Sequence, residues 1–128
     1  MKATVTVPMA MIGGFALGAL AVQALHAQAK PAAYGVAEVV VSNPDAYAKE
    51  FLPVIRKTIA DAGGKFLAAG GKTISLQGAA PAPRVVIIQW ANLDQEEAWW
   101  NSAATKDAFA IGAKYASFRN YVVEGIPQ

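Results

Sequence analysis

One acidic side chain, Glu38, stands alone in an apolar run, Tyr-Gly-Val-Ala-Glu-Val-Val-Val at residues 34–41. β-branched residues dominate this run, which predicts a strand. Because side chains alternate between the faces of a strand, Glu38 shares its face with Tyr34. If that face is covered, burial favours the protonated carboxyl and makes Glu38 a candidate catalytic acid or base. The alternative is that Glu38 pairs with a basic residue across a dimer or lies at an exposed rim.

Three polar residues could bind a ligand near Glu38. Tyr34 and Gln89 are expected on its face and could orient a ligand through hydrogen bonds, or could simply pack in a dimer. The guanidinium of Arg119 suits carboxylates, so Arg119 is a partner either for Glu38 or for an anionic ligand. Alternation within the last predicted strand instead favours the helix side for Arg119.

The sequence Trp99-Trp100-Asn101-Ser102 is the second candidate region. Two adjacent helical residues cannot both face one core, so we expect one tryptophan to be buried and the other to be partly exposed or in an interface. One of them, Trp99 in our prediction, could line a cavity. Asn101 could contact a ligand, but Asn101 and Ser102 are also of the types that cap helices.

Several kinds of chemistry are excluded by composition. The chain has no cysteine, and its single histidine, His26, lies in the N-terminal segment. Disulfides, thiolate nucleophiles and sulfur-ligated metals are therefore excluded, and no spaced set of metal ligands is present. We expect neither a metal nor an organic cofactor. A formal net charge of +2 with scattered signs gives no footprint for binding nucleic acid.

The N-terminal segment, residues 1–29, has the pattern of a secretory signal peptide. A lysine follows the first methionine, residues 5–25 are uncharged and largely apolar, and Ala-Gln-Ala ends at Ala29. Cleavage there predicts a periplasmic or secreted protein. The alternative is an uncleaved helix at residues 5–25 that anchors the protein in the membrane with its domain outside. Residues 30–33 are then a linker and residues 34–128 the folded domain.

The rest of the chain alternates between helical and strand patterns. Asn43 and Pro44 suit the start of a helix, and Pro53 predicts a kink or break within it. Residues 85–88 are continuously apolar, which favours a strand buried on both faces. After the first strand, the predicted elements are a helix at 43–62, strands at 65–69, 73–77 and 84–91, helices at 92–100 and 102–115, and a strand at 117–126.

This order, with residues 73–77 as a small hairpin extension, is βαββαβ. It predicts an α+β, ferredoxin-like fold, with an antiparallel four-stranded sheet and helices on one face. The other face would carry Tyr34, Val36, Glu38, Val85, Ile87 and Gln89. A large patch this apolar is expected to be covered, so we predict a homodimer whose sheets pack face to face. Any cavity is expected between the two sheets or between a sheet and its helices.

An ordered set of short motifs resembles domain-of-unknown-function family 1330. The set consists of Tyr34-Gly-Val-Ala-Glu38, Gly63-Gly64-Lys65-Phe66-Leu67, Gly70-Gly71, Arg84-Val85-Val86, Trp99-Trp100-Asn101-Ser102, Phe118-Arg119 and Val123-Glu124-Gly125. The resemblance covers about residues 34–125. It implies the dimeric α/β-barrel superfamily, whose members include cofactor-independent monooxygenases, muconolactone-isomerase-like enzymes and stress-linked dimers. It implies no particular reaction.

Three functions are consistent with these observations. The first is an exported homodimer that binds a small, partly apolar molecule between its sheets without a metal. The second is a cofactor-independent enzyme of the monooxygenase or isomerase kind, with Glu38 as acid or base. The third is a structural or interaction module, which would contact the membrane only if its N-terminal helix is retained.

Overall fold

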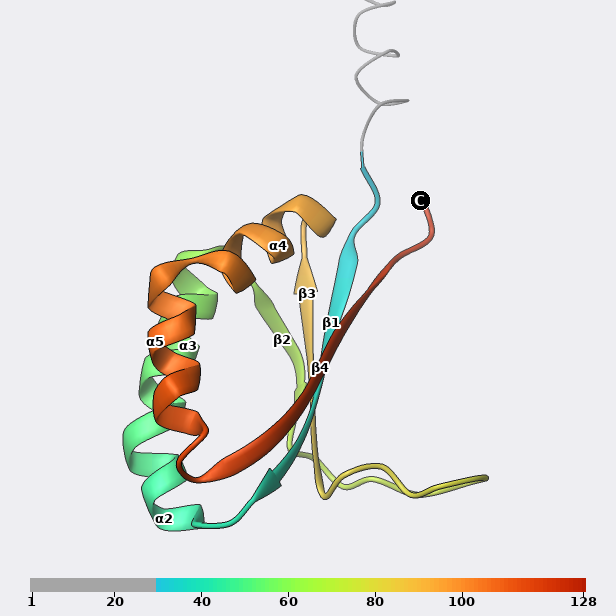
Figure 1. Ribbon diagram of the computed structural model, residues 1–128. Coiled ribbons are helices and arrows are strands. Elements are labelled where there is room, and N and C mark those ends of the chain that lie inside the picture. The colour runs from blue at the N-terminus through green and yellow to red at the C-terminus, as the bar shows by residue number, and fades with distance from the viewer. Residues whose placement is uncertain (1–29) are drawn as a thin grey trace, which may run out of the picture. The chain divides into compact units, whose positions relative to one another are not determined.

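The computed structural model describes residues 30–128 (Figure 1). Its elements are β1 (Ala33–Val41), α2 (Pro44–Ala46), a π-helical segment η1 (Tyr47–Phe51), α3 (Leu52–Asp61), β2 (Lys65–Ala69), β3 (Arg84–Trp90), α4 (Leu93–Asn101), α5 (Ala103–Gly112) and β4 (Ala116–Glu124). The predicted signal peptide or anchor lies outside the described residues. Within residues 30–128, no helix is both long and apolar enough to cross a membrane.

The four strands form one antiparallel sheet in the order β2-β3-β1-β4. With a helical segment after β1 and another after β3, this is the ferredoxin-like βαββαβ arrangement, as predicted. All helices lie on one face of the sheet (Figure 1). The core fills the space between that face and the helices and comprises Ala33, Val39, Tyr47, Phe51, Ile55, Ile59, Val86, Ile88, Trp90, Trp99 and Ala108.

Alternation along the central strands separates a helix face from an open face. In β1, Val39 is 2% exposed and packs under the helices, while its neighbour Val40 is 50% exposed on the other side. In β3, Val86 and Ile88 are buried, whereas Ile87 between them is only partly buried. The prediction that β3 is buried on both faces is therefore wrong for residues 30–128 of a single chain, because no layer of these residues covers the open face.

The first helical region contains the irregularity expected near Pro53, but in a different form. The Asn43 side chain caps the helix by accepting a hydrogen bond from the Ala46 N–H at 3.2 Å, as predicted. A π-helical turn follows, in which the Leu52 N–H bonds to the Tyr47 carbonyl. Pro53 then lies in the first turn of α3, where a missing N–H leaves no bond unmade. The π turn thus accommodates the proline.

The predicted strand at residues 73–77 is absent. Residues 70–83 form an exposed loop that projects on the side away from the helices (Figure 1). The Gly70 N–H still bonds to the Val85 carbonyl at 2.9 Å, but the pairing stops there. The returning arm contains Pro81 and Pro83, which have no N–H to donate, so it cannot complete a ladder. Residues 73–77 have a strand-like composition without a partner strand.

The second helical region breaks where the sequence predicts. Asn92 caps α4 through the Gln95 N–H at 2.9 Å, and Ser102 caps α5 through the Thr105 N–H at 3.2 Å. The Gln95 side chain does not return to Asn92 but joins two segments, accepting from the Ala91 N–H at 2.6 Å and donating to the Ala62 carbonyl at 2.9 Å. Residues Pro31–Gln128 form one compact unit with its own core.

Candidate functional site

Glu38 lies on the open face and is held there by two contacts. One carboxylate oxygen accepts a hydrogen bond from the Ala82 N–H at 3.3 Å, and the other pairs with Arg119 Nη1 at 3.3 Å. Arg119 stands directly opposite Glu38 in the β1–β4 register, so it belongs to the open face and not to the helix side. The alternative placement of Arg119 is therefore wrong, because strand pairing and not position within β4 alone determines the face.

Tyr34 and Gln89 also lie on the open face, opposite each other in the β1–β3 register. Both are partly buried. Tyr34 and Glu38 are four residues apart on one strand, which separates their Cα atoms by about 13 Å. The structure thus places these two predicted ligand contacts and the Glu38–Arg119 pair on one face, but as two separate pairs and not as one cluster.

A cavity of about 70 Å³ lies on the other side of the sheet, between its helix face and the helices. Of the predicted site residues, Trp99 lines this cavity, whereas Glu38, Tyr34, Gln89, Arg119 and Asn101 do not. Its walls are mostly apolar and are formed by Gly35, Val36, Ala37, Val39, Tyr47, Phe51, Leu52, Ile55, Arg56, Ile59, Phe66, Ala69, Arg84, Val86, Ile88, Trp90, Glu96, Trp99, Trp100, Phe109, Phe118, Asn120 and Tyr121. In a single chain, the cavity is therefore between sheet and helices.

Trp90, at the end of β3, is the most buried aromatic residue of this wall. It is 1% exposed, and its Nε1–H has no hydrogen-bond partner. Small residues make room for the ring, since a Cβ added to Gly64 would lie 2.8 Å from it and one added to Gly35 would lie 3.4 Å from Nε1. The sequence analysis missed Trp90, although the paired glycines before β2 were a signal of close packing.

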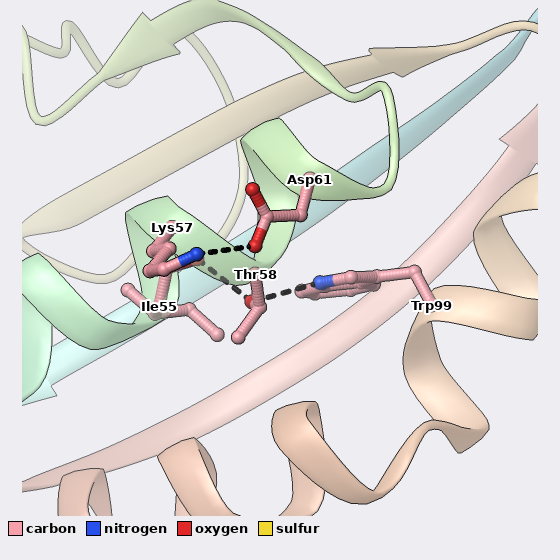
Figure 2. A network of polar contacts seen from close by, with 5 residues as sticks. All are labelled: Ile55, Lys57, Thr58, Asp61 and Trp99. Carbon is pink, nitrogen blue, oxygen red and sulfur yellow. Dashed lines mark hydrogen bonds and ion pairs between the residues drawn. The ribbon is translucent and has the colours of Figure 1, made fainter.

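Trp99 contributes its ring to the cavity wall and satisfies its polar atom elsewhere. Its Nε1–H donates to Thr58 Oγ1 at 3.0 Å, and the Thr58 hydroxyl donates to the Ile55 carbonyl at 2.8 Å (Figure 2). Trp99 is 7% exposed and Trp100 is 40% exposed, which confirms that only one of the two faces the core. Trp99 is thus fixed from both sides, through its ring and through its nitrogen.

Glu96 is a second acid that the sequence analysis overlooked as a site residue. It lies in the first turn of α4, where an acid is favourable, but it is nearly buried and lines the cavity. Burial raises the pKa of its carboxyl above 4.5, and the neighbouring Glu97 charge raises it further. The cavity wall therefore includes a carboxyl group that protonates more readily than an exposed glutamate.

Arg84, at the start of β3, lines the cavity at the opposite end of this strand from Trp90. Its guanidinium carbon lies 5.8 Å from the centre of the Tyr47 ring, and its buried Nε has no hydrogen-bond partner. Burial raises the pKa of Tyr47, while Arg84 and Arg56 oppose this shift through their positive charges. The sequence analysis assigned no role to these arginines, because β3 and α3 bring them together only in the folded chain.

Asn101 and Ser102 have structural roles in the described chain. Asn101 is exposed, and its side chain donates to the Glu97 carbonyl at 2.9 Å within α4. Ser102 is the predicted cap of α5. Residues 30–128 contain no group of three or more His, Cys, Asp or Glu side chains that could hold a metal ion.

Comparison with known proteins gives the family. Residues 32–126 match the domain of unknown function DUF1330. The chain belongs to the DUF1330 family. No curated protein matches the sequence of this DUF1330 chain.

Solved structures share the fold of the DUF1330 chain at low sequence identity. A protein of unknown function from Rhodopseudomonas palustris has 13% identity and a TM-score of 0.61, with 82% of this chain and 92% of that chain covered. A conserved protein from Methanosarcina mazei Go1 has 15% identity and a TM-score of 0.50, with 77% and 97% covered. SnoaB, a cofactor-independent oxygenase from Streptomyces nogalater, has 14% identity and a TM-score of 0.49, with 77% and 96% covered.

Proposed function

We propose that this protein is an exported homodimer that binds a small, largely apolar molecule in the cavity between its sheet and its helices. This position differs from the one expected between two sheets. The proposal assigns the two faces of one sheet to two tasks, with the helix face holding the ligand and the open face holding the second copy.

The observation that carries ligand binding is a pair of unpaired buried donors on an apolar wall. Trp90 and Arg84 both line the cavity, and Trp90 Nε1 and Arg84 Nε are buried without a hydrogen-bond partner within residues 30–128. Leaving a buried donor unpaired costs on the order of 1–3 kcal/mol, and most such groups in proteins do find a partner. A ligand with a hydrogen-bond acceptor would recover part of this cost, while its apolar part would contact the aromatic wall.

The test is native mass spectrometry of residues 30–128 purified from the protein's own host. We expect an extra small mass on the wild-type chain and its loss in Ala37→Leu, because Ala37 lines the cavity and a larger side chain would fill it. Val40→Leu is the matched control, since Val40 lies on the open face of the same strand. A wild-type chain that carries no extra mass, or an A37L chain that keeps it, would contradict ligand binding at this site.

Dimerisation through the open face is supported by the apolar side chains that this face exposes. These are Val36, Val40, Val85, Ile87, Tyr121 and Val123, all exposed or only partly buried in the single chain. The loop at residues 70–83 projects on the side away from the helices (Figure 1) and adds Ile74 and Leu76, which are 71% and 92% exposed. Covering them with a second copy removes apolar area from water.

Sedimentation of residues 30–128 tests the dimer. We expect twice the mass of one chain, and a single-chain mass for Val123→Asp, because the new carboxylate would be buried without a partner. Thr58→Ser is the control for handling, since Thr58 lies in α3 on the far side of the sheet. A wild-type chain that sediments as a monomer at micromolar concentration would contradict the dimer.

Export rests on the leader pattern of residues 1–29. We propose cleavage after Ala29 and a periplasmic or secreted location for the domain. The intact mass of the protein from the host's periplasmic fraction tests this. A chain that begins at Lys30 would support cleavage, whereas a full-length chain in the membrane fraction would support the anchor.

The cofactor-independent enzyme remains the alternative function. It assigns acid or base catalysis to Glu38, and the geometry gives it less support because Glu38 lies outside the cavity and its carboxylate contacts Ala82 and Arg119. An activity that Glu38→Gln abolishes without changing the bound mass would favour it.

A further inference from the structure

The cavity has a basic end that ordinary packing does not explain. Arg84 from β3 and Arg56 from α3 both line the cavity, and the charges of both act on the hydroxyl of Tyr47. The cavity wall therefore carries two cationic side chains, and the guanidinium carbon of Arg84 lies 5.8 Å from the centre of the Tyr47 ring. Two like charges on one wall repel each other, and an anion bound beside them would offset that repulsion.

Neither arginine has its charge neutralised by the described chain. Within residues 30–128, side-chain ion pairs join Lys57 to Asp61 and Arg119 to Glu38. Neither pair involves Arg56 or Arg84. Arg84 is partly buried, and its Nε is a buried donor without an acceptor. A guanidinium binds a carboxylate with paired N–H···O bonds, which would supply that acceptor.

The space behind the arginines is apolar and narrow. It is lined along β3 from Arg84 to Trp90, yet its volume is only about 70 Å³. That is about half of an engineered cavity of roughly 150 Å³ that binds benzene, so the enclosed space is too small for a ring and holds a tail of only a few carbons. Trp90 lies six residues from Arg84, or about 20 Å along the strand, and is therefore not part of the basic end.

The cavity wall is exposed along β2 and on α3. Phe66 and Ala69 of β2 line the cavity and are exposed, and so is Arg56 on α3. In the β2–β3 register, Ala69 lies opposite Val86, near Arg84, whereas Phe66 lies opposite Ile88, nearer Trp90. A ligand entering between β2 and α3 would place its tail inside and leave its head beside the two arginines. The charged head could thus keep part of its hydration.

We propose that the cavity binds an unbranched aliphatic monocarboxylate, with the carboxylate at Arg84 and Arg56 and the alkyl chain along the helix face of β3. This inference rests on the ligand-binding function proposed above and specifies its ligand class. Arg84 is the specificity-determining residue, because its buried Nε–H would donate a hydrogen bond to the ligand's carboxylate and hold the carboxylate at this end of the cavity.

The test uses two probes that differ only in charge and have a three-carbon tail, butanoate and butanamide. Binding to residues 30–128, which contain the compact unit with its own core, is followed by tryptophan fluorescence, since Trp90, Trp99 and Trp100 line the cavity. We expect butanoate to bind at least about tenfold more tightly than butanamide, in line with the strength of hydrogen bonds to charged groups. Equal affinity for both would overturn the carboxylate inference and leave apolar ligand binding intact.

Variants separate the basic end from the rest of the chain. Arg84→Met should weaken butanoate binding at least about tenfold and leave butanamide unchanged, because it keeps the apolar stem and removes the charge. Arg56→Met, at an exposed position, should weaken it less. Arg119→Met on the open face should have no effect. Wild-type affinity in both R84M and R56M, or no butanoate binding at all, would overturn the inference, while the mass bound in host-purified protein decides ligand binding separately.

Discussion

The helix face and the open face of the sheet are built from the same strands, yet they differ in how far other parts of the described chain cover them. On the helix face, Val39, Val86 and Ile88 are buried under the helices, among aromatic and aliphatic side chains. On the open face, their immediate neighbours are exposed or partly buried. Because strand neighbours alternate, one residue's shift along β1 changes a core position into a surface position.

The difference teaches where polar groups can be tolerated. On the open face, Glu38 has partners for both carboxylate oxygens and remains within reach of water. On the helix face, Trp90 Nε1 and Arg84 Nε are buried without partners. Unmet polar groups inside a packed core are costly, and they mark a binding site more clearly than a paired acid at a surface does.

The adjacent valines of β1 give the largest expected contrast between the faces. Val39→Asp places an unpaired charge in the core and should destabilise the fold by more than about 4 kcal/mol, enough to unfold a typical domain. Val40→Asp should leave the chain folded and break only the proposed dimer. Circular dichroism and sedimentation of both variants check this. A folded V39D chain would show that the helix face is not the core.

How much of this contrast could be predicted from the sequence depends on how local the signal is. The faces of β1, the caps at Asn43 and Ser102, and the ferredoxin-like order follow from alternation, capping and element order. The prediction of a strand at residues 73–77 was wrong because a strand needs a partner, which composition does not reveal. The prediction that Arg119 lies on the helix side was wrong because strand register is set by pairing.

The cavity was harder to predict than the fold. Its polar residues come from different elements, with Arg56 on α3, Arg84 and Trp90 on β3, and Glu96 on α4. No short spacing in the sequence connects them, so only tertiary packing brings them to one wall. Glu38 drew attention because it stands alone in an apolar strand, but its face was the one that the helices leave uncovered.

Removing the acceptor of Trp99 tests how rigid the helix face is. Thr58→Val leaves the Trp99 N–H without its partner and should lower the free energy of unfolding by about 1–3 kcal/mol. Thr58→Ser keeps the hydroxyl and should cost less. Urea unfolding of both variants measures the difference. If T58V and T58S lose the same stability, the loss comes from the methyl group and not from the hydrogen bond.

Glu96 should make the helix face sensitive to pH. Its pKa in the folded chain is raised above 4.5, so the folded state holds a proton that the unfolded state releases. The free energy of unfolding should therefore fall as pH rises above about 4.5. Glu96→Gln should remove this slope and raise stability at pH 7, with little change at pH 4.

Unfolding at both pH values measures the effect of Glu96. Glu97→Gln is the matched control, because Glu97 contributes only the smaller cause of the shift and its removal should give a smaller gain in the same direction. Parallel pH profiles for E96Q and the wild-type chain would mean that the carboxyl is solvated after all.

The smallest expected effect is that of the Glu38–Arg119 pair, and it connects the two faces to the dimer. The side chains of Arg119 and Glu38 are 75% and 16% exposed in the single chain, so the pair should stabilise the monomer by less than about 1 kcal/mol. Covering the open face with a second copy would desolvate the pair and strengthen its coupling. A double-mutant cycle of Glu38→Gln and Arg119→Met, measured in the wild-type and Val123→Asp backgrounds, compares the two states. A larger coupling energy in the wild-type background, less reduced by salt, would place the pair inside the dimer interface. Equal, salt-sensitive coupling in both backgrounds would place it at a solvated rim, and would then remove the structural basis for a buried catalytic acid on this face.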